Sequence, residues 1–384
     1  MTLRERLVGG PDRVVGLDVA RGLAVLGMFV AHVGVAEGPT TWLEVADGRS
    51  SVLFALVAGV SLALVTGGAR PLTGDALIHA RTRVLVRAVL LLALVALLDL
   101  LGTRVLLILG FYAAYFVLAL PFLRWGPGRL AVAAGVVAVV GPPIAYWGPE
   151  VLARAGLRAP HDGSGAATDF LLTGHYPAVV WMAYVFAGMA IGRCDLTSSL
   201  VRTRLVVGGL AATALGYLAS GALVGGVEPG AIEDQVATTS SRYVAEPYAW
   251  GDAWPTGWFL AQAEPHDNTF FEVVGSGGFA VAVLGLCLFA RRTGAVALSP
   301  LAATGAMALT VYSLQIVAIW HWDLVGTPTN GPLLVMVAVT LVAATAWRLT
   351  LGRGPLERLF AVVALRTAPP PRPETATSPE PTPR

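Results

Sequence analysis

The sequence of 384 residues contains no lysine, only two cysteines and few charged residues of any kind. Charged residues make up 13% of the chain, against about 25% in soluble domains, while hydrophobic residues make up 55%. Cys194 and Cys287 match no metal-ligand spacing, so we expect two packing residues, with neither a disulfide framework nor a bound metal. The net charge of +2 gives no indication of nucleic acid binding, which requires a concentrated basic patch. The composition therefore predicts a multi-pass membrane protein.

Apolar stretches recur along the chain at the length that crosses a bilayer. About 20 residues in a helix are needed to cross about 30 Å of hydrocarbon. We therefore predict an all-α, polytopic fold of about ten transmembrane helices. The ten stretches lie near residues 15–35, 50–67, 84–101, 105–123, 129–147, 176–193, 205–226, 270–290, 297–319 and 331–351.

Arginines are distributed unequally between the segments that join these spans. With the N-terminus in the cytoplasm, the inner segments and both termini hold most of them. Since positive residues favour the cytoplasmic side, we predict that both termini are cytoplasmic. The first span has charges inside it and no small-residue cleavage site, so we expect it to be retained. The outer loops hold only Arg49, Arg104, Arg154, Arg158 and Arg242.

Two segments outside the spans have a distinctive composition. Residues 1–367 form the predicted transmembrane domain, and the Pro-rich, polar residues 368–384 predict a disordered cytoplasmic tail. Just before this tail, GPLERLFAVVALR predicts a short amphipathic helix at the inner surface. The long outer loop 227–268 carries aromatic residues that either stack on sugar rings or form an aromatic belt at the headgroups. These residues are Tyr243, Tyr248, Trp250, Trp254 and Trp258.

The first span carries an acid, a base and an imidazole within LDVARGLAVLGMFVAHVG (17–34). Arg21 and His32 are 11 positions apart, which places them about 20° apart around a helix and about 16 Å apart along it. Asp18 pairs with Arg21 at i,i+3. A charge near the bilayer centre costs at least about 2.5 kcal/mol, so this polar stripe is a candidate functional site. The alternative is a self-neutralising Asp18–Arg21 pair that anchors the helix, with His32 as an interfacial residue.

Further polar residues gather at the two ends of the predicted spans. On the inner side, HARTRVLVR supplies Arg81, Arg83 and Arg87, which either bind phosphate oxygens or only follow the positive-inside bias. On the outer side, residues at the mouths of several spans either enter the bundle or are solvated loop residues. These outer candidates are His32, Asp47, Arg49, Asp99, Arg104, His175, Tyr176, Glu264, His266, Asp267 and Glu272.

The first span resembles known membrane acyltransferases. LDVARGLAVLGMFVAH is similar to the R-x10-H motif of acyltransferase family 3, and GLDVARGLAVLGM resembles the first span of heparan-α-glucosaminide N-acetyltransferases and of YeiB-like bacterial proteins. Residues 47–64 and 300–315 look most like the YeiB-like group. The heparan enzymes have Asn where His32 stands and a catalytic His about a dozen residues later, whereas residues 33–46 here contain no His.

The resemblance implies an acyl-CoA-dependent O- or N-acyltransferase. On the family 3 pattern His32 is the general base, Arg21 organises the donor, and the arginines of 81–87 begin the site for cytoplasmic acetyl-CoA. The implied acceptor is an extracytoplasmic glycan or lipid of a bacterial plasma membrane, and it approaches His32 from the outer side. The candidate catalytic residues are His32, Arg21, Asp18, Asp47, Glu264 and His266. Arg49, His175, Tyr176 and Asp267 are then the candidate residues for acceptor binding.

A transporter or lipid flippase is the main alternative, because buried charges also line substrate pathways. It favours repeated, broken helices, and Pro142-Pro143 is a candidate break in the fifth span. A membrane scaffold without chemistry is a further alternative, in which Asp18, Arg21 and His32 are structural. No serine or cysteine stands at a nucleophile elbow, which favours direct attack of the acceptor on the thioester and leaves an acetyl-imidazole intermediate open. The oligomeric state is not predicted.

Overall fold

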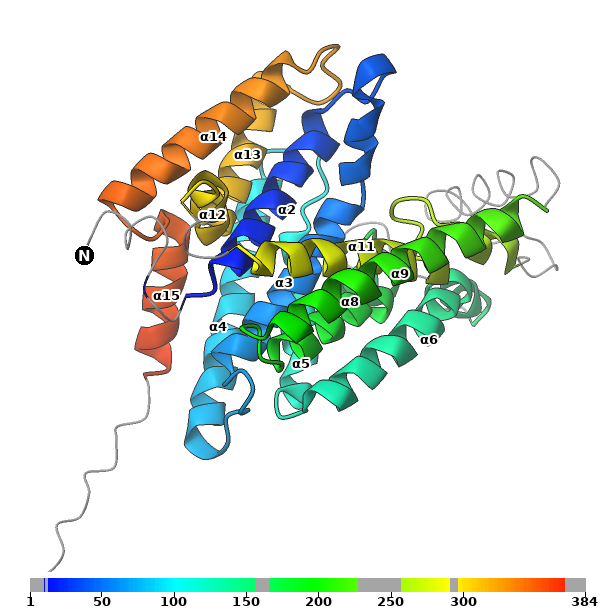
Figure 1. Cartoon of the computed structure of the whole chain (residues 1–384), viewed down its shortest axis with the longest axis horizontal. Helices are drawn as coiled ribbons and strands as arrows, with labels where there is room; N and C mark the ends of the chain where they lie inside the picture. The colour runs from blue at the N-terminus through cyan, green and yellow to red at the C-terminus, as the bar shows by residue number, and fades with distance from the viewer. Residues whose placement is uncertain (1–9, 11–12, 156–165, 227–256, 291–295, 370–384) are drawn as a thin grey trace, which may run out of the picture.

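The computed structural model describes residues 10, 13–155, 166–226, 257–290 and 296–369, and every regular element in these ranges is a helix. Figure 1 shows the longer helices, coloured in chain order from the N-terminus to the C-terminus. They are α2 (Val15–Val33), α3 (Arg49–Val65), α4 (Gly74–Asp99), α5 (Leu109–Ala119), α6 (Pro127–Arg154), α8 (Ala178–Gly192), α9 (Ser199–Val224), α11 (Phe270–Leu288), α12 (Ser299–Ala306), α13 (Ala308–Trp322), α14 (Gly331–Thr350) and α15 (Pro355–Thr367). Short helical turns occur at η1 (Gly38–Ala46), η2 (Leu120–Phe122), α7 (Ala166–Thr168), η3 (Asp169–Thr173) and η4 (Gly257–Ala261).

The all-α fold predicted from the sequence is confirmed for the described residues, and each of the ten predicted stretches contains a helix. Six helices are long and apolar enough to cross a membrane, and the bent pair α12–α13 adds a seventh candidate. The apolar helices α5 and α8 are shorter than the others. The chain is therefore a membrane protein by the length and composition of its helices, while the full number of ten spans stays a prediction.

The buried centre of the bundle is made by α2, α3, α8 and α11. Within their apolar windows α2, α3 and α11 are 56–72% buried, whereas α9 and α14 are 17% buried and face outward. Small residues allow close approach at the centre, as is usual between membrane helices. A Cβ added to Gly59 of α3 would lie 2.2 Å from the carbonyl oxygen of Val185, and one added to Gly188 of α8 would lie 2.0 Å from that of Leu56.

Two features of the helices differ from the sequence prediction. The stretch 297–319 was predicted as one span, but it is divided at Met307 into α12 and α13, which are bent by 83°. Conversely, Pro142 and Pro143 were a candidate break, but α6 continues through both. A proline removes only its own backbone donor, and the flanking turns of α6 still pack against α8.

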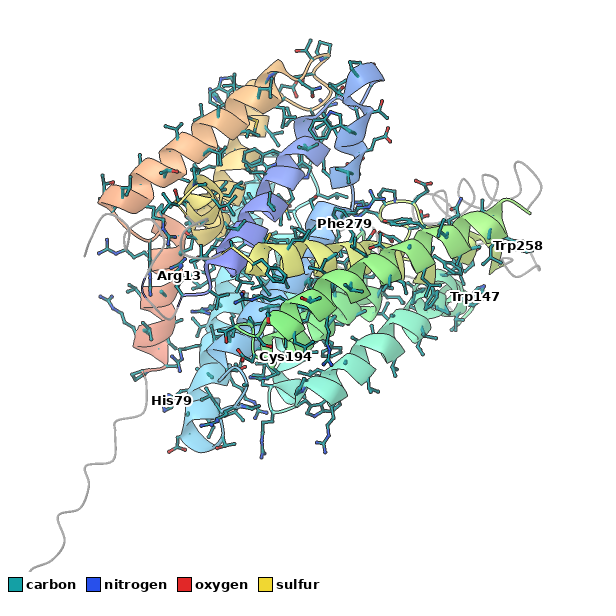
Figure 2. The ribbon with its side chains drawn as sticks, in the orientation of Figure 1. Arg13, His79, Trp147, Cys194, Trp258 and Phe279 are labelled. Atoms are coloured by element: carbon teal, nitrogen blue, oxygen red, sulfur yellow. The ribbon has the colours of Figure 1, made fainter. Side chains whose placement is uncertain are left out.

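The two ends of the bundle carry different residues. Figure 2 shows Arg13 and His79 on the left of the molecule, and Trp147 and Trp258 together at the far right. We call the end with Arg13 and His79 the inner end, and the end with His32 and the segment 264–268 the outer end. The names follow the orientation predicted from the arginine bias.

The predicted amphipathic helix and the aromatic outer loop lie outside the predicted spans. The predicted amphipathic helix is present as α15 and packs against α4. Trp258 lies in η4, with 48% of its surface exposed. The other loop aromatics, Tyr243, Tyr248, Trp250 and Trp254, and the tail from residue 370 lie outside the described residues.

Candidate active site

The inner part of α2 holds a buried ionic network. Asp18 is 5% exposed, and its carboxylate accepts hydrogen bonds from Arg13 Nε at 2.5 Å and from Arg21 Nη1 at 3.0 Å. Arg21 also donates from Nη2 to Ser61 Oγ of α3 at 2.7 Å and from Nη1 to the Gly305 carbonyl of α12 at 3.3 Å. The predicted i,i+3 pair is therefore present, and the guanidinium of Arg21 joins three helices.

Glycines allow α12 to lie directly on this part of α2. A Cβ on Gly305 would overlap the carbonyl oxygen of Asp18, and a Cβ on Gly22 would lie 2.2 Å from the carbonyl oxygen of Leu301. Neither position has room for a larger side chain without separating the helices. This contact brings the Gly305 carbonyl within reach of Arg21.

Arg21 opens onto a cavity of about 280 Å³, which we call the inner cavity. Arg87 of α4 and Glu357 of α15 also line it, and its other walls are mostly apolar side chains, Phe54, Tyr112 and Phe116 among them. Of the three arginines predicted as donor ligands, only Arg87 lines this cavity. Arg83 lies one turn away and donates from Nε to the His79 carbonyl at 3.2 Å, and Arg81 is not among the lining residues.

Glu357 caps the start of α13, at the break between α12 and α13 and at the edge of the inner cavity. Its Oε1 accepts from the backbone N–H groups of Leu309 at 2.8 Å and Thr310 at 3.0 Å, and its Oε2 accepts from Thr310 Oγ1 at 2.6 Å. These donors are the free amides of the first turn of α13. The C-terminal helix α15 therefore supplies the cap of a helix that begins inside the bundle.

The outer end holds a histidine cluster formed by His175 and His266 beside Tyr176, and His32 lies at the outer end of α2. The rings of His175 and His266 lie 4.3 Å apart between centroids, and Tyr176 meets His266 edge-on at 5.3 Å. The pKa of His266 is lowered mainly by burial, then by the charge of His175 and least by that of His32. The sequence predicted all three histidines as site residues from separate segments, and the fold brings two of them, His175 and His266, into contact.

His266 is held in an unusual backbone conformation by a buried carboxylate. His266 and Asn268 have positive φ values of 69° and 58°, which non-glycine residues rarely adopt. Glu272, which is 1% exposed, accepts from the His266 N–H at 2.9 Å and from the Asn268 N–H at 2.7 Å. Thr269 caps α11 and receives the Glu272 N–H at 3.2 Å. The segment is thus fixed by the first turn of α11.

The side chain of Asn268 ties this segment to α8. Its Oδ1 accepts from Trp181 Nε1 at 2.8 Å, and its Nδ2 donates to the carbonyls of His266 at 3.0 Å and His175 at 3.4 Å. The Trp181 ring stacks parallel to that of His266 at 6.3 Å. His175 and His266 therefore share one hydrogen-bonded support.

Burial sets the charge of the outer cluster near neutral pH. It lowers the pKa of His266 to about 3, helped by the neighbouring histidines, and it lowers the pKa of His175. It raises the pKa of Asp267 to about 7, to which the charge of Glu264 adds, while a backbone hydrogen bond from Glu264 opposes the rise. His266 is therefore neutral at pH 7, and Asp267 is poised to exchange a proton there.

A pocket of about 380 Å³ opens beside this cluster, and we call it the outer pocket. His175, His266 and Asp267 line it, opposite the rings of Tyr146 and Phe259. The latter two rings stack nearly parallel, with centroids 5.3 Å apart. The pocket thus combines an aromatic wall with ionisable groups.

Asp47, Arg49 and Glu264 face a different pocket, of about 520 Å³. Arg49 donates from Nε to the Tyr217 hydroxyl at 2.9 Å and lies over the Tyr217 ring at 4.9 Å. Asp47 and Glu264 are exposed. The structure therefore divides the predicted outer residues into two groups, and these three are not part of the histidine cluster.

The Arg21–His32 face of α2 is not an open path. Val25, Met28 and Phe29 lie between the two residues on this face and are at most 3% exposed. His32 lines neither the inner cavity nor the outer pocket. The predicted polar stripe is in fact two polar ends that packed apolar side chains separate, because the periodicity of one helix does not reveal what its neighbours place between them.

Several residues of the site were not selected from the sequence. Ser61 and Gln315 bind Arg21 and His32 through side-chain hydrogen bonds, with Gln315 Nε2 2.7 Å from His32 Nδ1. A glutamine inside the apolar run VYSLQIVAIW was the available signal, since a buried amide needs partners. The Thr269-x-x-Glu272 pattern signalled the capping of α11. Among the described residues no group of three His, Cys, Asp or Glu side chains is arranged to hold a metal ion.

The helices, the buried charges and the two cavities define a polytopic membrane protein with ionisable groups inside its helical bundle. The family model described as heparan-alpha-glucosaminide N-acetyltransferase, catalytic, matches residues 13–219, more than half of the chain. The chain belongs to this family, as the first span indicated. The matched region holds Asp18, Arg21, His32, Arg87 and His175. No curated protein and no solved structure gives a significant match.

Proposed function

We propose that this protein transfers an acetyl group from cytoplasmic acetyl-CoA to an extracytoplasmic glycan or lipid acceptor in a bacterial plasma membrane. Membership of the family supports a membrane acetyltransferase with acetyl-CoA as donor. The observation that carries the proposal is the arrangement of α2, which presents Arg21 to a cavity at one end and holds His32 against Gln315 at the other.

The inner cavity is the proposed donor site. Arg21 and Arg87 are the guanidinium groups on its wall, and guanidinium binds phosphate and carbonyl oxygens through paired donors. Its apolar walls suit the pantetheine arm and the acyl group rather than the nucleotide. Arg83, one turn from Arg87, extends the positive surface on which the CoA phosphates rest.

The outer pocket is the proposed acceptor site. The stacked rings of Tyr146 and Phe259 offer a face for the C–H groups of a sugar ring, and Asp267 and His175 offer hydrogen-bond partners for its polar groups. His175 and His266 line this pocket, and His32 lies at the same outer end, so an acceptor bound here is held at the end of the bundle that carries the proposed base.

In the proposed reaction His32 is the general base. It removes the proton from the acceptor hydroxyl or amine as the acceptor heteroatom bonds to the thioester carbonyl carbon. The C–S bond then breaks, and the CoA thiolate takes up the proton that His32 received. Val25, Met28 and Phe29 separate the two sites, so the transfer requires these side chains to move and let the acyl end of the donor approach His32.

The test uses purified protein in liposomes with acetyl-CoA inside and candidate acceptors outside. Release of CoA thiol and acetylation of an outer glycan or lipid support the proposal. His32→Ala is expected to reduce transfer by at least about 100-fold, the usual contribution of a general base, while His321→Ala, which alters an exposed histidine of α13, leaves it unchanged. Substrate uptake without thioester cleavage would overturn the proposal in favour of a transporter.

The natural acceptor is identified by mass spectrometry of envelope glycans and lipids from a deletion strain. The expected result is the loss of one acetyl group from a single class of molecule, restored by the wild-type chain and not by His32→Ala. Unchanged acetylation of every envelope component would contradict the proposed acceptor class.

A further inference from the structure

Gln315 is a buried amide in the middle of α13. Its side chain is 2% exposed, and its helix neighbours are mostly apolar. Burying an amide without hydrogen bonds is costly, so its partners determine what it does. Both partners lie on α2, at the outer end of the Arg21–His32 face.

The Gln315 amide contacts two groups through one atom. Its Nε2 lies 3.3 Å from the Met28 carbonyl oxygen and 2.7 Å from His32 Nδ1. Its Oε1 is buried and has no hydrogen-bond partner among the described residues. The amide is thus satisfied on its nitrogen side only.

The Met28 carbonyl decides which way the amide faces. A carbonyl oxygen only accepts, so the atom 3.3 Å from it must be the donating nitrogen. The same nitrogen then donates to His32 Nδ1, whose lone pair accepts it. A neutral imidazole carries one nitrogen-bound proton, and in this arrangement that proton is on Nε2 of His32.

We propose that Gln315 is a positioning residue that selects the tautomer of His32 and so sets when this imidazole accepts a proton. The inference rests on the proposed function, in which His32 is the base. With the amide as found, Nε2 of His32 carries a hydrogen and only donates. When the amide turns over, Gln315 Oε1 accepts from His32 Nδ1–H. The lone pair on His32 Nε2 is then free to take the acceptor proton.

The unpaired atoms favour such an exchange. In the orientation found, Gln315 Oε1 has no donor. In the reversed orientation, Gln315 Oε1 accepts from His32, and Gln315 Nε2 no longer donates to the Met28 carbonyl. The Met28 carbonyl favours the orientation found, which is therefore the resting one, but the unpaired Oε1 reduces the cost of turning the amide over when His32 carries its proton on Nδ1. After proton transfer, the imidazolium donates from Nδ1 to Oε1, which stabilises the charge formed in the reaction.

Two substitutions separate positioning from packing. Gln315→Met keeps the shape and removes both hydrogen bonds, so His32 is no longer oriented; we expect kcat to fall about 10- to 100-fold with KM for acetyl-CoA unchanged. Gln315→Glu offers oxygens that accept from Nδ1–H, and we expect it to retain most of the wild-type kcat. A Gln315→Met variant with wild-type kcat, or a Gln315→Glu variant as impaired as Gln315→Met, would overturn the proposal.

The tautomer itself is measured without turnover. Nitrogen-15 spectra of histidine-labelled protein, with His32 assigned by its absence in His32→Gln, are expected to show Nε2–H in the wild type and Nδ1–H in Gln315→Glu. An Nδ1–H signal in the resting wild type would disprove the assignment. Because this readout needs no acyl transfer, it remains valid if the proposed function fails, and it tests Gln315 in the wild type even if Gln315→Met does not fold.

Discussion

Asp18 is the residue on which the inner network depends. It is buried and accepts from both Arg13 and Arg21. Removing one partner of a buried ion pair costs about 3–5 kcal/mol, because the remaining charge is left uncompensated. We predict that Asp18→Ala lowers the free energy of unfolding by this amount, measured by thermal or denaturant unfolding in detergent.

The chain provides a matched control for this prediction. Arg104 and Asp323 form an ion pair of 3.3 Å whose side chains are 68% and 85% exposed. Exposed pairs contribute at most about 1 kcal/mol, so Arg104→Gln is expected to have little effect. Equal destabilisation by Asp18→Ala and Arg104→Gln would show that burial of the network does not matter.

The outer pocket should make stability depend on pH in two opposing ways. Asp267 has a pKa of about 7 in the fold and 3.8 when unfolded, so the native state holds the extra proton and stability falls as pH rises between these values. His266 has a pKa of about 3 in the fold and 6.5 when unfolded, so the unfolded state holds the extra proton and stability rises with pH in that window. Over most of the range the two slopes cancel.

Single substitutions should reveal the two slopes separately. Asp267→Asn removes the falling contribution, so its unfolding temperature is expected to rise more steeply than that of the wild type between pH of about 4 and 6.5. His266→Gln removes the rising contribution, and its slope should shift in the opposite direction. Unfolding temperatures in one detergent across this range provide the measurement, and parallel curves for all three proteins would contradict both pKa shifts.

At the scale of elements, α15 stabilises the start of α13 through Glu357. Loss of a helix cap costs about 0.5–2 kcal/mol, and here the freed amides belong to Leu309 and Thr310. We predict that Glu357→Ala increases hydrogen exchange at the first turn of α13, measured by mass spectrometry of peptides covering 308–311. Arg358→Ala, on the exposed side of α15, is the control, and similar exchange in both variants would argue against the cap.

For the whole molecule, hydropathy predicted where the helices lie, because the length of an apolar run depends only on local composition. The break at Met307 was missed, since the start of α13 is capped by Glu357, 50 residues later in the sequence. The Asp18–Arg21 pair was predictable from spacing within one turn. The Gln315–His32 pair joins residues 283 positions apart, and only the packing of α13 on α2 brings them together. Likewise, the division of the outer residues between two pockets depends on tertiary contacts.

The break at Met307 also bears on topology, because a bent pair is either one broken span or a re-entrant loop. The α12 end of the pair lies beside Asp18 and Gly22 of α2. Beyond α13, Asn330 exchanges hydrogen bonds of 2.7 and 2.9 Å with the backbone of Val35, just past the other end of α2. The 15 residues of α13 extend about 22 Å between these levels. We therefore predict that the pair is one broken span that runs the length of α2.

Single cysteines should place both ends of this pair relative to the membrane. In a Cys194→Ser, Cys287→Ser background, we predict that a membrane-impermeant maleimide labels Thr41→Cys and Thr329→Cys in intact cells and labels Thr197→Cys only after lysis, as the arginine bias requires. All three side chains are in exposed positions. If Thr329→Cys, like Thr197→Cys, is labelled only after lysis, α12–α13 is a re-entrant loop. If Thr197→Cys is the one labelled in intact cells, the orientation of the whole bundle is reversed, and the proposed donor site faces away from cytoplasmic acetyl-CoA.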